Sequence, residues 1–264
     1  PTAFKIRGGL GKVDKLIING AECEPYLNGD HLTMLNFPEQ LLKGIQLIRI
    51  ASGLDHCYYG IEKNKQDAID LLNSLHPENY GIEIVPEEVK YPQGGEKMQV
   101  KAVTGREVKP GGIPSGVGCN VVSTRTAYAI YQACYEGKPV IERIVTVAGS
   151  ALKAPVNALT RVGTPFEYLA EQCGGFVKTP RKIVLGGPMM GICATSFEAP
   201  TIKGTAGVLF FTEEEDRHVE HPTCIRCGKC ITVCPMNLEP VFMYMYYNKG
   251  DFEMMQKYHI TDCF

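Results

Sequence analysis

Four closely spaced cysteines are the residues with the clearest chemistry in this sequence. They are Cys224, Cys227, Cys230 and Cys234, and Pro235 follows the last of them in the spacing C-x2-C-x2-C-x3-C-P. Thiolates at this spacing can converge on one [4Fe–4S] cube, because two intervening residues let a tight loop curl around it. Zinc ribbons also use C-x2-C pairs, but they place a dozen or more residues between the two pairs. The spacing therefore favours an iron–sulfur cluster over zinc.

A second cluster is expected from the role of the fourth cysteine. In two-cluster ferredoxins, the fourth cysteine of such a run ligates the other cluster. Cys234 then belongs to a second site, whose own motif should follow further along the chain. Cys263 stands where that motif would begin, and the alternative for this residue is an ordinary thiol. We expect two 4Fe–4S clusters, with the second motif truncated, and the absence of an initiator methionine before Pro1 suggests that both ends are cut.

Composition restricts the class of protein. A chain of 264 residues can form a large core and two or three domains. Its 44% hydrophobic and 21% charged residues are typical of a soluble globular protein, and a net charge of −2 gives no reason to expect nucleic acid as a partner. The sequence shows no apolar stretch of membrane-spanning length and no signal peptide. Eleven cysteines, an odd number, do not form a disulfide framework and indicate a reducing cytosol.

The first part of the chain alternates short apolar runs with segments of helical periodicity. Strands are predicted at residues 15–18, 56–61 and 82–85. Pro86 is expected to end the third strand, Pro38 to begin a helix, and Asn64 to cap the next helix. The positions expected to face inward on these two helices are Leu41, Ile45, Ile48, Ala68, Leu71, Leu72 and Leu75. Strands alternating with helices predict an α/β fold with a largely parallel sheet.

Polar residues follow the first predicted strand. In open parallel sheets, ligands bind outside the carboxyl ends of the strands. Asn19, Glu22 and Glu24 come directly after residues 15–18, and their amide and carboxylates can hydrogen-bond ribose or ribityl hydroxyls or a carboxamide. The alternative is a solvated acidic turn.

Two further polar segments are expected at the same edge of the sheet. Residues 91–98 follow the third strand, and their glycines open a predicted helix over 95–103, where a phosphate or flavin ring could approach closely. Residues 111–118 are also rich in glycine and lead to a predicted helix over 127–135, at whose start capping is the alternative to phosphate binding. The three segments together predict one ligand site.

The pattern changes near residue 138. Strands around one short helix predict a small α+β module, with the strands at 144–148, 182–185 and 208–211 and the helix at 164–172. The acidic residues 212–222 are expected to be a linker into the cysteine region. Residues 238–249 are rich in aromatic side chains and methionine, and they predict a helix that packs over the cluster and excludes water from it.

Four motifs in a fixed order carry a family resemblance. They are Asn-Gly-Ala-Glu-Cys-Glu-Pro at 19–25, Tyr-Pro-Gln-Gly-Gly-Glu-Lys at 91–97, Gly-Gly-Pro-Met-Met-Gly at 186–191, and the cysteine run. Over essentially its whole length the chain resembles the RnfC family, the NADH-oxidising subunits of Rnf electron transport complexes. Its first part is similar to the flavin subunit of respiratory complex I, and its middle resembles an SLBB (soluble ligand-binding β-grasp) domain. Ala21 and Gly95 depart from complex I, which has acidic residues there, and the change at Gly95 is typical of RnfC.

The resemblance implies three domains. It predicts a complex-I-flavin-subunit-like α/β domain over 1–137 that binds FMN and NAD(H), an SLBB-like β-grasp domain over 138–215, and an α-helical ferredoxin-like segment over 216–264. The cofactor-binding residues that it implies are Lys5, Asn19, Glu22, Glu24, Tyr91, Gly94, Gly95, Glu96, Asn120 and Thr124. The implied metal ligands are Cys224, Cys227, Cys230, Cys234 and Cys263. Lys5 would lie near the FMN phosphate, although the glycine-rich loop that the family carries before it is missing from this sequence.

The function implied by the resemblance is electron transfer. Hydride would pass from NADH to FMN, and single electrons would then pass through the 4Fe–4S clusters to the other Rnf subunits, in a ferredoxin:NAD oxidoreductase. No general base or nucleophile is required. The expected location is peripheral, at the cytoplasmic face of the inner membrane, with no transmembrane segment of its own. The cysteines outside the cluster motifs, Cys23, Cys57, Cys134, Cys173 and Cys193, are predicted to be buried small hydrophobes.

Three alternative functions remain open on the sequence. A cobalamin reductase of the PduS type resembles RnfC in combining flavin, SLBB and ferredoxin-like parts. A non-catalytic iron–sulfur docking module would use the same cysteines while its N-terminal loops hold no flavin. A zinc-stabilised interaction domain would hold a different metal in the cysteine run.

Overall fold

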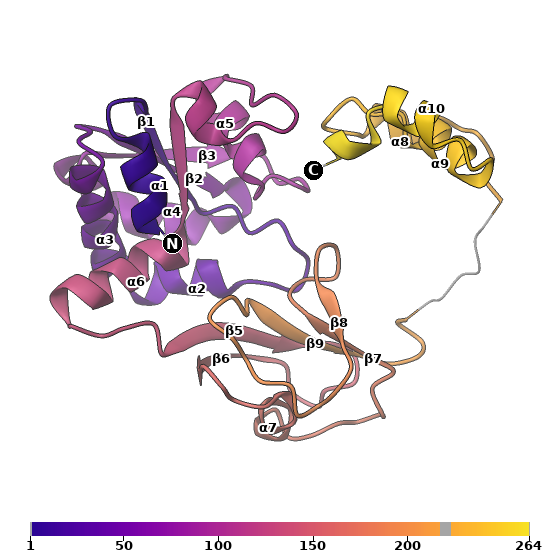
Figure 1. The fold of residues 1–264 in the computed structure, drawn as a ribbon. Helices are drawn as coiled ribbons and strands as arrows, with labels where there is room; N and C mark the ends of the chain where they lie inside the picture. The colour runs from indigo at the N-terminus through magenta and orange to yellow at the C-terminus, as the bar shows by residue number, and fades with distance from the viewer. Residues whose placement is uncertain (1, 217–222, 264) are drawn as a thin grey trace. The chain divides into compact units, whose positions relative to one another are not determined.

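The computed structural model describes residues 2–216 and 223–263, which fall into two compact units (Figure 1). The first unit comprises residues 1–108 and 113–217, and the second comprises residues 109–112 and 218–264. The expected linker at 212–222 lies largely outside the described residues, as do residues 1 and 264.

A four-stranded parallel sheet is the centre of the first α/β layer. The strand order is β3-β2-β1-β4, with β1 at Lys15–Asn19, β2 at Cys57–Glu62, β3 at Ile82–Glu87 and β4 at Cys119–Ser123. The α/β fold with a largely parallel sheet, predicted from the alternation of strands and helices, is confirmed. Because β1 is central and its side chains alternate between two covered faces, its apolar run is buried on both sides.

Helices cover both faces of this sheet (Figure 1). Leu16 and Ile18 of β1 pack against one set of helices, and Ile17 packs on the opposite face against Val100 of α5. The helices of the first set are α2 (Gly29–Asn36), α3 (Pro38–Ala51), α4 (Gln66–Ser74) and α6 (Thr124–Tyr135). The other helices of this layer are α1 (Thr2–Gly9) and α5 (Glu96–Thr104), with short 3-10 turns η1 (Lys63–Lys65), η2 (Pro77–Tyr80) and η3 (Pro114–Val117).

Most of the local predictions for this layer are confirmed, and two are wrong. Pro38 begins α3, whose predicted inward positions are buried. Asn64 does not cap α4, because it lies inside η1 and Lys65 occupies the N-cap position. Pro86 lies within β3 instead of ending it, which an edge strand tolerates because its free side needs no backbone donor. Helices α1 and α2 were not predicted.

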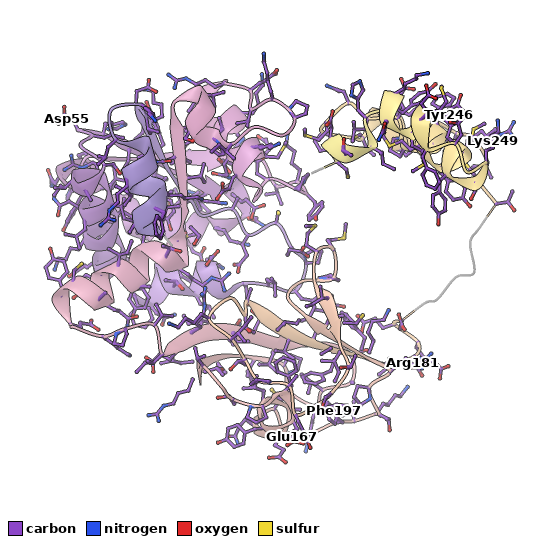
Figure 2. The ribbon with its side chains drawn as sticks, viewed as in Figure 1. Asp55, Glu167, Arg181, Phe197, Tyr246 and Lys249 are labelled. Carbon is purple, nitrogen blue, oxygen red and sulfur yellow. The ribbon has the colours of Figure 1, made fainter. Side chains whose placement is uncertain are left out.

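A second, five-stranded sheet follows, in the order β6-β5-β9-β7-β8. Its strands are β5 (Glu142–Ala148), β6 (Val156–Arg161), β7 (Lys182–Leu185), β8 (Ile192–Ala194) and β9 (Gly207–Phe211), and α7 spans Phe166–Gln172. Its core contains Phe166 and Phe210, and Phe197 stacks on Phe210 with ring centroids 6.3 Å apart (Figure 2). The predicted strands and helix are confirmed, whereas β6 and β8 were missed because both are largely exposed and lack a clear apolar run.

The cysteine-bearing unit is small and helical. It contains α8 (Lys229–Thr232), α9 (Pro240–Asn248), α10 (Phe252–Lys257) and η4 (Ile260–Asp262). Met243 and Met255 are buried, and Phe242 and Tyr246 each stack on Tyr258 with centroids 5.4 Å apart. The predicted helix over 238–249 corresponds to α9. Among the described residues, none of the helices has the length and apolar character needed to cross a membrane.

Candidate functional site: the carboxyl edge of the parallel sheet

The chain reverses direction across the sheet at β1. After β1 it adds β2 and β3 on one side, and it then returns to place β4 on the other side. In open parallel sheets this switch point, at the carboxyl ends of the strands, is where ligands bind. Asn19 ends β1 and Ser123 ends β4, so the loop after β1 and the start of α6 meet there.

Asn19 joins two of the three segments that were predicted to form one site, and it also contacts the start of α6. Its side-chain Nδ2 donates to the carbonyl oxygen of Gly94 at 2.7 Å, and its Oδ1 accepts from the backbone N–H of Ala21 at 3.1 Å. Its own carbonyl oxygen accepts from the Thr124 hydroxyl at 3.0 Å. One amide side chain and one carbonyl therefore connect the loop after β1, the loop before α5 and the start of α6.

The third predicted segment, residues 111–118, leads into the amino end of β4. There the Gly118 carbonyl oxygen accepts from the N–H groups of Asp14 and Lys15. The prediction that this segment lies at the carboxyl edge is therefore wrong.

Lys5 forms a second group with Glu96 and Asn120. The Lys5 ammonium pairs with the Glu96 carboxylate and also donates to the carbonyl oxygen of Val121 at 2.8 Å. The Asn120 amide donates to the Lys5 carbonyl oxygen at 3.3 Å. A basic group and an amide thus lie together over β4, and the ion pair is about half exposed, so the lysine remains accessible to an anion.

Gly94 is the point of closest approach between two loops. Its backbone N–H donates to the Cys23 sulfur at 3.2 Å, and a Cβ at this position would lie 2.8 Å from the carbonyl oxygen of Ala21. Only glycine fits there without a shift of backbone. Gly95 occupies the N-cap position of α5, and Tyr91 is 40% exposed, with a pKa raised first by burial and then by the charge of Glu24.

Glu22 is turned toward α2. Its carboxylate accepts from the backbone N–H groups of Asp30 at 3.1 Å and His31 at 3.3 Å, in the first turn of that helix, where a negative charge is favoured. Burial, followed by the charge of Asp30, raises the pKa of Glu22 to about 7. Glu24 points elsewhere, because its two oxygens accept from the backbone N–H groups of Met189 at 3.0 Å and Met190 at 2.8 Å.

The predicted residues therefore divide into three sets. Lys5, Asn19, Gly94, Glu96, Asn120 and Thr124 are linked to one another in pairs by hydrogen bonds, and Gly95 and Tyr91 lie in the loop that Asn19 contacts. Glu22 and Glu24 make other contacts. Thr124 is fully buried, and its hydroxyl lies 3.0 Å from that of Tyr59, so its hydrogen-bonding capacity is already used within the protein.

Sequence reasoning missed a row of buried carboxyl groups at the strand ends. Glu62 ends β2 and Glu87 ends β3, and the two are paired in register. Gln99 and Gln93 donate to one oxygen of Glu87 at 2.5 and 3.2 Å, while the other oxygen and Gln99 Oε1 are buried without a partner among the described residues. Burial raises the pKa of Glu87 to about 7. Glu62 and Glu87 are each the last residue of an apolar strand, and this position is the sequence signal that could have identified them.

The residues at this edge fit FMN in their chemistry. Lys5 is a half-exposed cation suited to a phosphate, whereas the Asn120 amide is buried and already donates to the Lys5 carbonyl oxygen. The glycine at position 94 keeps the neighbouring backbone free of side chain. The cysteine region provides the thiol donors that an iron–sulfur cluster requires. Within residues 2–216 and 223–263, however, no three His, Cys, Asp or Glu side chains are gathered in a position to hold a metal ion.

The individual cysteines differ in environment. Cys224, Cys227, Cys230 and Cys263 are exposed, and the half-buried sulfur of Cys234 accepts from the Leu238 N–H at 3.4 Å. The prediction that the remaining cysteines are buried holds for Cys57 and Cys173, and Cys23 is half-buried. It is wrong for Cys134 and Cys193, which are exposed, the first near the end of α6 and the second in the edge strand β8.

Comparisons with known proteins agree with this architecture. Residues 1–132 match the family model of the Nuo51 FMN-binding domain, and residues 144–192 match the SLBB domain. The structure is similar to a crystal structure of an NAD+-reducing [NiFe]-hydrogenase in the H2-reduced state, with a TM-score of 0.67 and 20% identity, covering 82% of this chain and 44% of that one. At this identity the likeness shows the fold alone.

Curated relatives carry names that agree with the motif resemblance. The chain is 40% identical to a subunit of the proton-translocating ferredoxin:NAD(+) oxidoreductase complex of Clostridium ljungdahlii, over 95% of this chain and 55% of the relative. It is 38% identical to the corresponding subunit of the Na(+)-translocating ferredoxin:NAD(+) oxidoreductase complex of Acetobacterium woodii, over 95% of this chain and 57% of that one. The chain thus spans about half the length of the curated relatives it matches. With half of its residues matched by the family model and its parallel sheet in place, the chain belongs to the family of the Nuo51 FMN-binding domain.

Proposed function

We propose that this chain is the flavin- and NADH-binding part of an electron-transfer oxidoreductase, the RnfC component of an Rnf-type ferredoxin:NAD oxidoreductase complex. The observation that supports it best is the pair of hydrogen bonds by which Asn19 connects the Gly94 loop and Thr124 at the carboxyl edge of the parallel sheet. FMN, when bound, accepts an electron pair as hydride and releases electrons singly. The protein's own task is to bind, orient and shield the reacting groups.

The residues at the edge divide this task. Lys5, with Asn120 beside it, would hold the phosphate of FMN, exchanging part of its contact with Glu96 for the new anion. Asn19, Gly94 and Gly95 would present backbone and amide groups to the ring system. Tyr91 and Glu96 would flank the nicotinamide side, and Glu22, Glu24 and Thr124 would support the loops from behind through the contacts described above.

The cysteine region would carry two 4Fe–4S clusters. Cys224, Cys227 and Cys230 would ligate one cluster, and Cys234 and Cys263 would belong to the other. Gly228 has a left-handed backbone, with φ of 73°, which lets the run turn sharply between Cys227 and Cys230. The all-thiol donor set supports iron–sulfur over the oxygen-rich sites of hard cations.

The domain boundaries, partners and location follow from the same proposal. We place the FMN and NADH domain at 1–137, the SLBB-like domain at 138–215 and the ferredoxin-like segment at 216–264. The names of the relatives support other Rnf subunits and ferredoxin as partners. The expected place of action is the cytoplasmic face of the cell membrane, by peripheral association.

Anaerobic absorbance spectroscopy tests this function. The protein is reconstituted with FMN, iron and sulfide, and spectra are recorded before and after addition of NADH. Bleaching of the flavin bands followed by bleaching of the cluster absorbance is expected. Bound FMN that NADH leaves oxidised would rule out the NADH oxidoreductase, and a corrinoid titration of the same sample would then test the cobalamin reductase.

A lysine pair gives the matched control for the flavin site. Lys5→Met removes the cation next to Asn120 and should weaken FMN binding about tenfold or more, because a charge-assisted phosphate contact is lost. Lys12→Met removes an exposed lysine from the loop just beyond α1 and should leave FMN affinity unchanged. Equal FMN affinity in the two variants would show that Lys5 does not hold the phosphate.

A further inference from the structure

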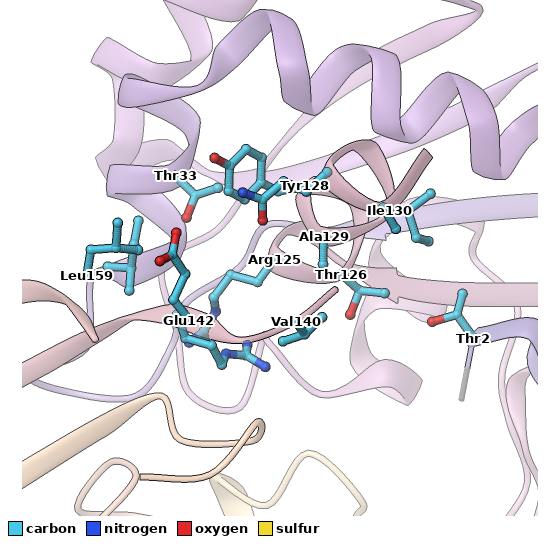
Figure 3. Close-up of a pocket in the computed structure, with 14 residues that line it drawn as sticks. Thr2, Thr33, Arg125, Thr126, Tyr128, Ala129, Ile130, Val140, Glu142 and Leu159 are labelled. Atoms are coloured by element: carbon cyan, nitrogen blue, oxygen red, sulfur yellow. The ribbon is translucent and has the colours of Figure 1, made fainter. Parts of the chain in front are cut away.

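A cavity that includes none of the predicted cofactor residues lies where α6 meets the five-stranded sheet (Figure 3). Its volume is about 290 Å³. Residues from α6 form one wall, residues from β5 and its lead-in form the other, and Leu159 of β6 lies at the rim. Small-ligand pockets begin at about 300 Å³, so this cavity can accept a compact organic molecule.

Most of the cavity wall is apolar. The side chains that provide it are Tyr128, Ala129 and Ile130 from the parallel-sheet layer and Val140, Ile144 and Leu159 from the five-stranded layer. Leu159 is 62% exposed at the rim, so the cavity is open to solvent on that side. An apolar body of a ligand would exchange water contacts for these side chains, which favours binding.

Two arginines are the cationic residues of the cavity lining, Arg125 on the α6 side and Arg143 on the β5 side. Arg125 donates through Nε to the buried carboxylate of Asp30 at 2.5 Å, but its Nη1 is buried and lacks a hydrogen-bond partner among the residues the structure describes. Arg143 donates to the carbonyl oxygen of Lys203 and forms no ion pair with a carboxylate within the described ranges. The Arg143 guanidinium is therefore the donor that a ligand carboxylate could pair with.

The acidic groups nearby do not neutralise both arginines. Asp30 is held by Arg125, and Glu142, which also lines the cavity, is paired with Lys138. Glu22 lies within electrostatic range of Arg125, but its own pKa is raised to about 7, so it carries only part of a charge near neutral pH. Burial, followed by the charge of Arg125, lowers the pKa of Arg143 to about 10, and the charge of Asp30 opposes this shift.

We propose that this cavity is a binding site for a small organic carboxylate. The carboxylate would accept hydrogen bonds from the Arg143 guanidinium, whose planar fork matches a carboxylate, and the Arg125 side chain would add positive charge to the cavity lining. The apolar body would lie along Ala129 and Ile144 toward Leu159. This site is separate from the proposed flavin edge, and its occupancy does not depend on FMN, NADH or iron–sulfur clusters.

The sequence offers a convenient reporter for the test, because it contains no tryptophan. Leu159→Trp places a single indole at the exposed rim, where its fluorescence reports on occupancy of the cavity. Benzoate is the probe, and benzamide, which has the same shape without the charge, is its comparison. Saturation-transfer NMR of benzoate on the unsubstituted chain provides a second measurement that does not depend on the reporter.

Benzoate is expected to bind saturably, and benzamide about tenfold more weakly or not at all, because a charge-assisted hydrogen bond is lost. Arg143→Met should weaken benzoate binding by a similar factor. Arg181→Met removes an exposed arginine that lies just before β7 and outside the cavity wall, and it should leave the affinity unchanged (Figure 2). Equal binding of benzoate and benzamide, equal affinity in the two arginine variants, or no saturation-transfer signal would each overturn the proposal.

Discussion

Glu24 of the loop after β1 accepts a hydrogen bond from the backbone N–H of Met190, at 2.8 Å, in the turn between β7 and β8. Its second oxygen accepts from Met189, so one carboxylate secures two backbone donors of the other sheet. Gly187 lies against the same carboxylate, where a Cβ would overlap Oε2. A residue that the motif resemblance assigned to the cofactor thus also fastens the parallel-sheet layer to the five-stranded layer.

Glu24→Ala should lower the free energy of unfolding by about 1–3 kcal/mol, because two backbone donors lose a charged acceptor. Chemical denaturation measures this loss. Glu167→Ala, at an exposed glutamate of α7, is the matched control and should change stability by less than about 0.5 kcal/mol. Equal losses in the two variants would show that the Glu24 contacts do not hold the two layers together.

Gly94→Val should destabilise the chain and weaken FMN binding together. The added side chain meets the Ala21 carbonyl oxygen and the Cys23 sulfur, so the loop before α5 must move away from Asn19. A loss of about 1–3 kcal/mol is expected from this overpacking. Thermal unfolding and FMN titration are the measurements, and Gly116→Ala is the control, since a Cβ there meets nothing within 4 Å. If Gly94→Val loses no more stability and no more FMN affinity than Gly116→Ala, the close approach of the two loops does not require glycine at position 94.

Stability should fall as the pH rises from about 4.5 to above 7. The folded pKa values of Glu22 and Glu87 are raised to about 7 from the ordinary value of 4.5, so the folded state binds more protons than the unfolded state in this window. The stabilisation is complete below the unfolded pKa and is lost as these buried carboxyls ionise. Because one pKa unit corresponds to about 1.4 kcal/mol, the loss is on the order of 3 kcal/mol for each of the two carboxyls. Denaturation midpoints measured between pH 5 and pH 8 test this loss of stability.

Glu87→Gln isolates one of these two groups. The amide stays neutral and can donate to Gln99 Oε1, which is buried without a partner among the described residues. The variant should therefore match the unsubstituted chain at pH 5 and exceed its stability at pH 8 by about 1 kcal/mol or more. Glu83→Gln, on the same strand but exposed, should keep the original pH dependence. If neither variant is more stable than the unsubstituted chain at pH 8, then the pKa of Glu87 is not raised in the folded protein.

Cys227→Ser should remove iron from the reconstituted protein. Loss of one thiolate from the run leaves its cluster with an incomplete ligand set, so about four iron atoms per chain should be lost or become labile. Iron and sulfide analysis, together with the absorbance of the cluster, measures this. Cys193→Ser changes an exposed cysteine of β8 and should retain the full iron content. Zinc in place of iron, or equal iron in both variants, would contradict the cluster assignment.

Local periodicity was sufficient for most of the elements. The apolar run at 15–18, the proline at the start of α3 and the stripe on that helix each dictate their own conformation through neighbours in sequence. The helix α2 could not be predicted in this way, because its first turn is stabilised by Glu22 through contacts with the Asp30 and His31 backbone. The three-residue strand β8 exists only because β7 lies beside it.

The candidate site shows the same division. Residue types, their order and the strand ends were enough to predict a flavin context for Asn19, Gly94 and Asn120 and an iron–sulfur context for the cysteine run, because those signals are carried by short motifs. The partners of each side chain were decided only in the folded structure. Pairings such as Asn19 with Gly94, Lys5 with Glu96 and Glu24 with Met190 join residues 75 to 166 positions apart. Contacts at such separations depend on how the sheets and loops pack, and a one-dimensional pattern does not contain that information.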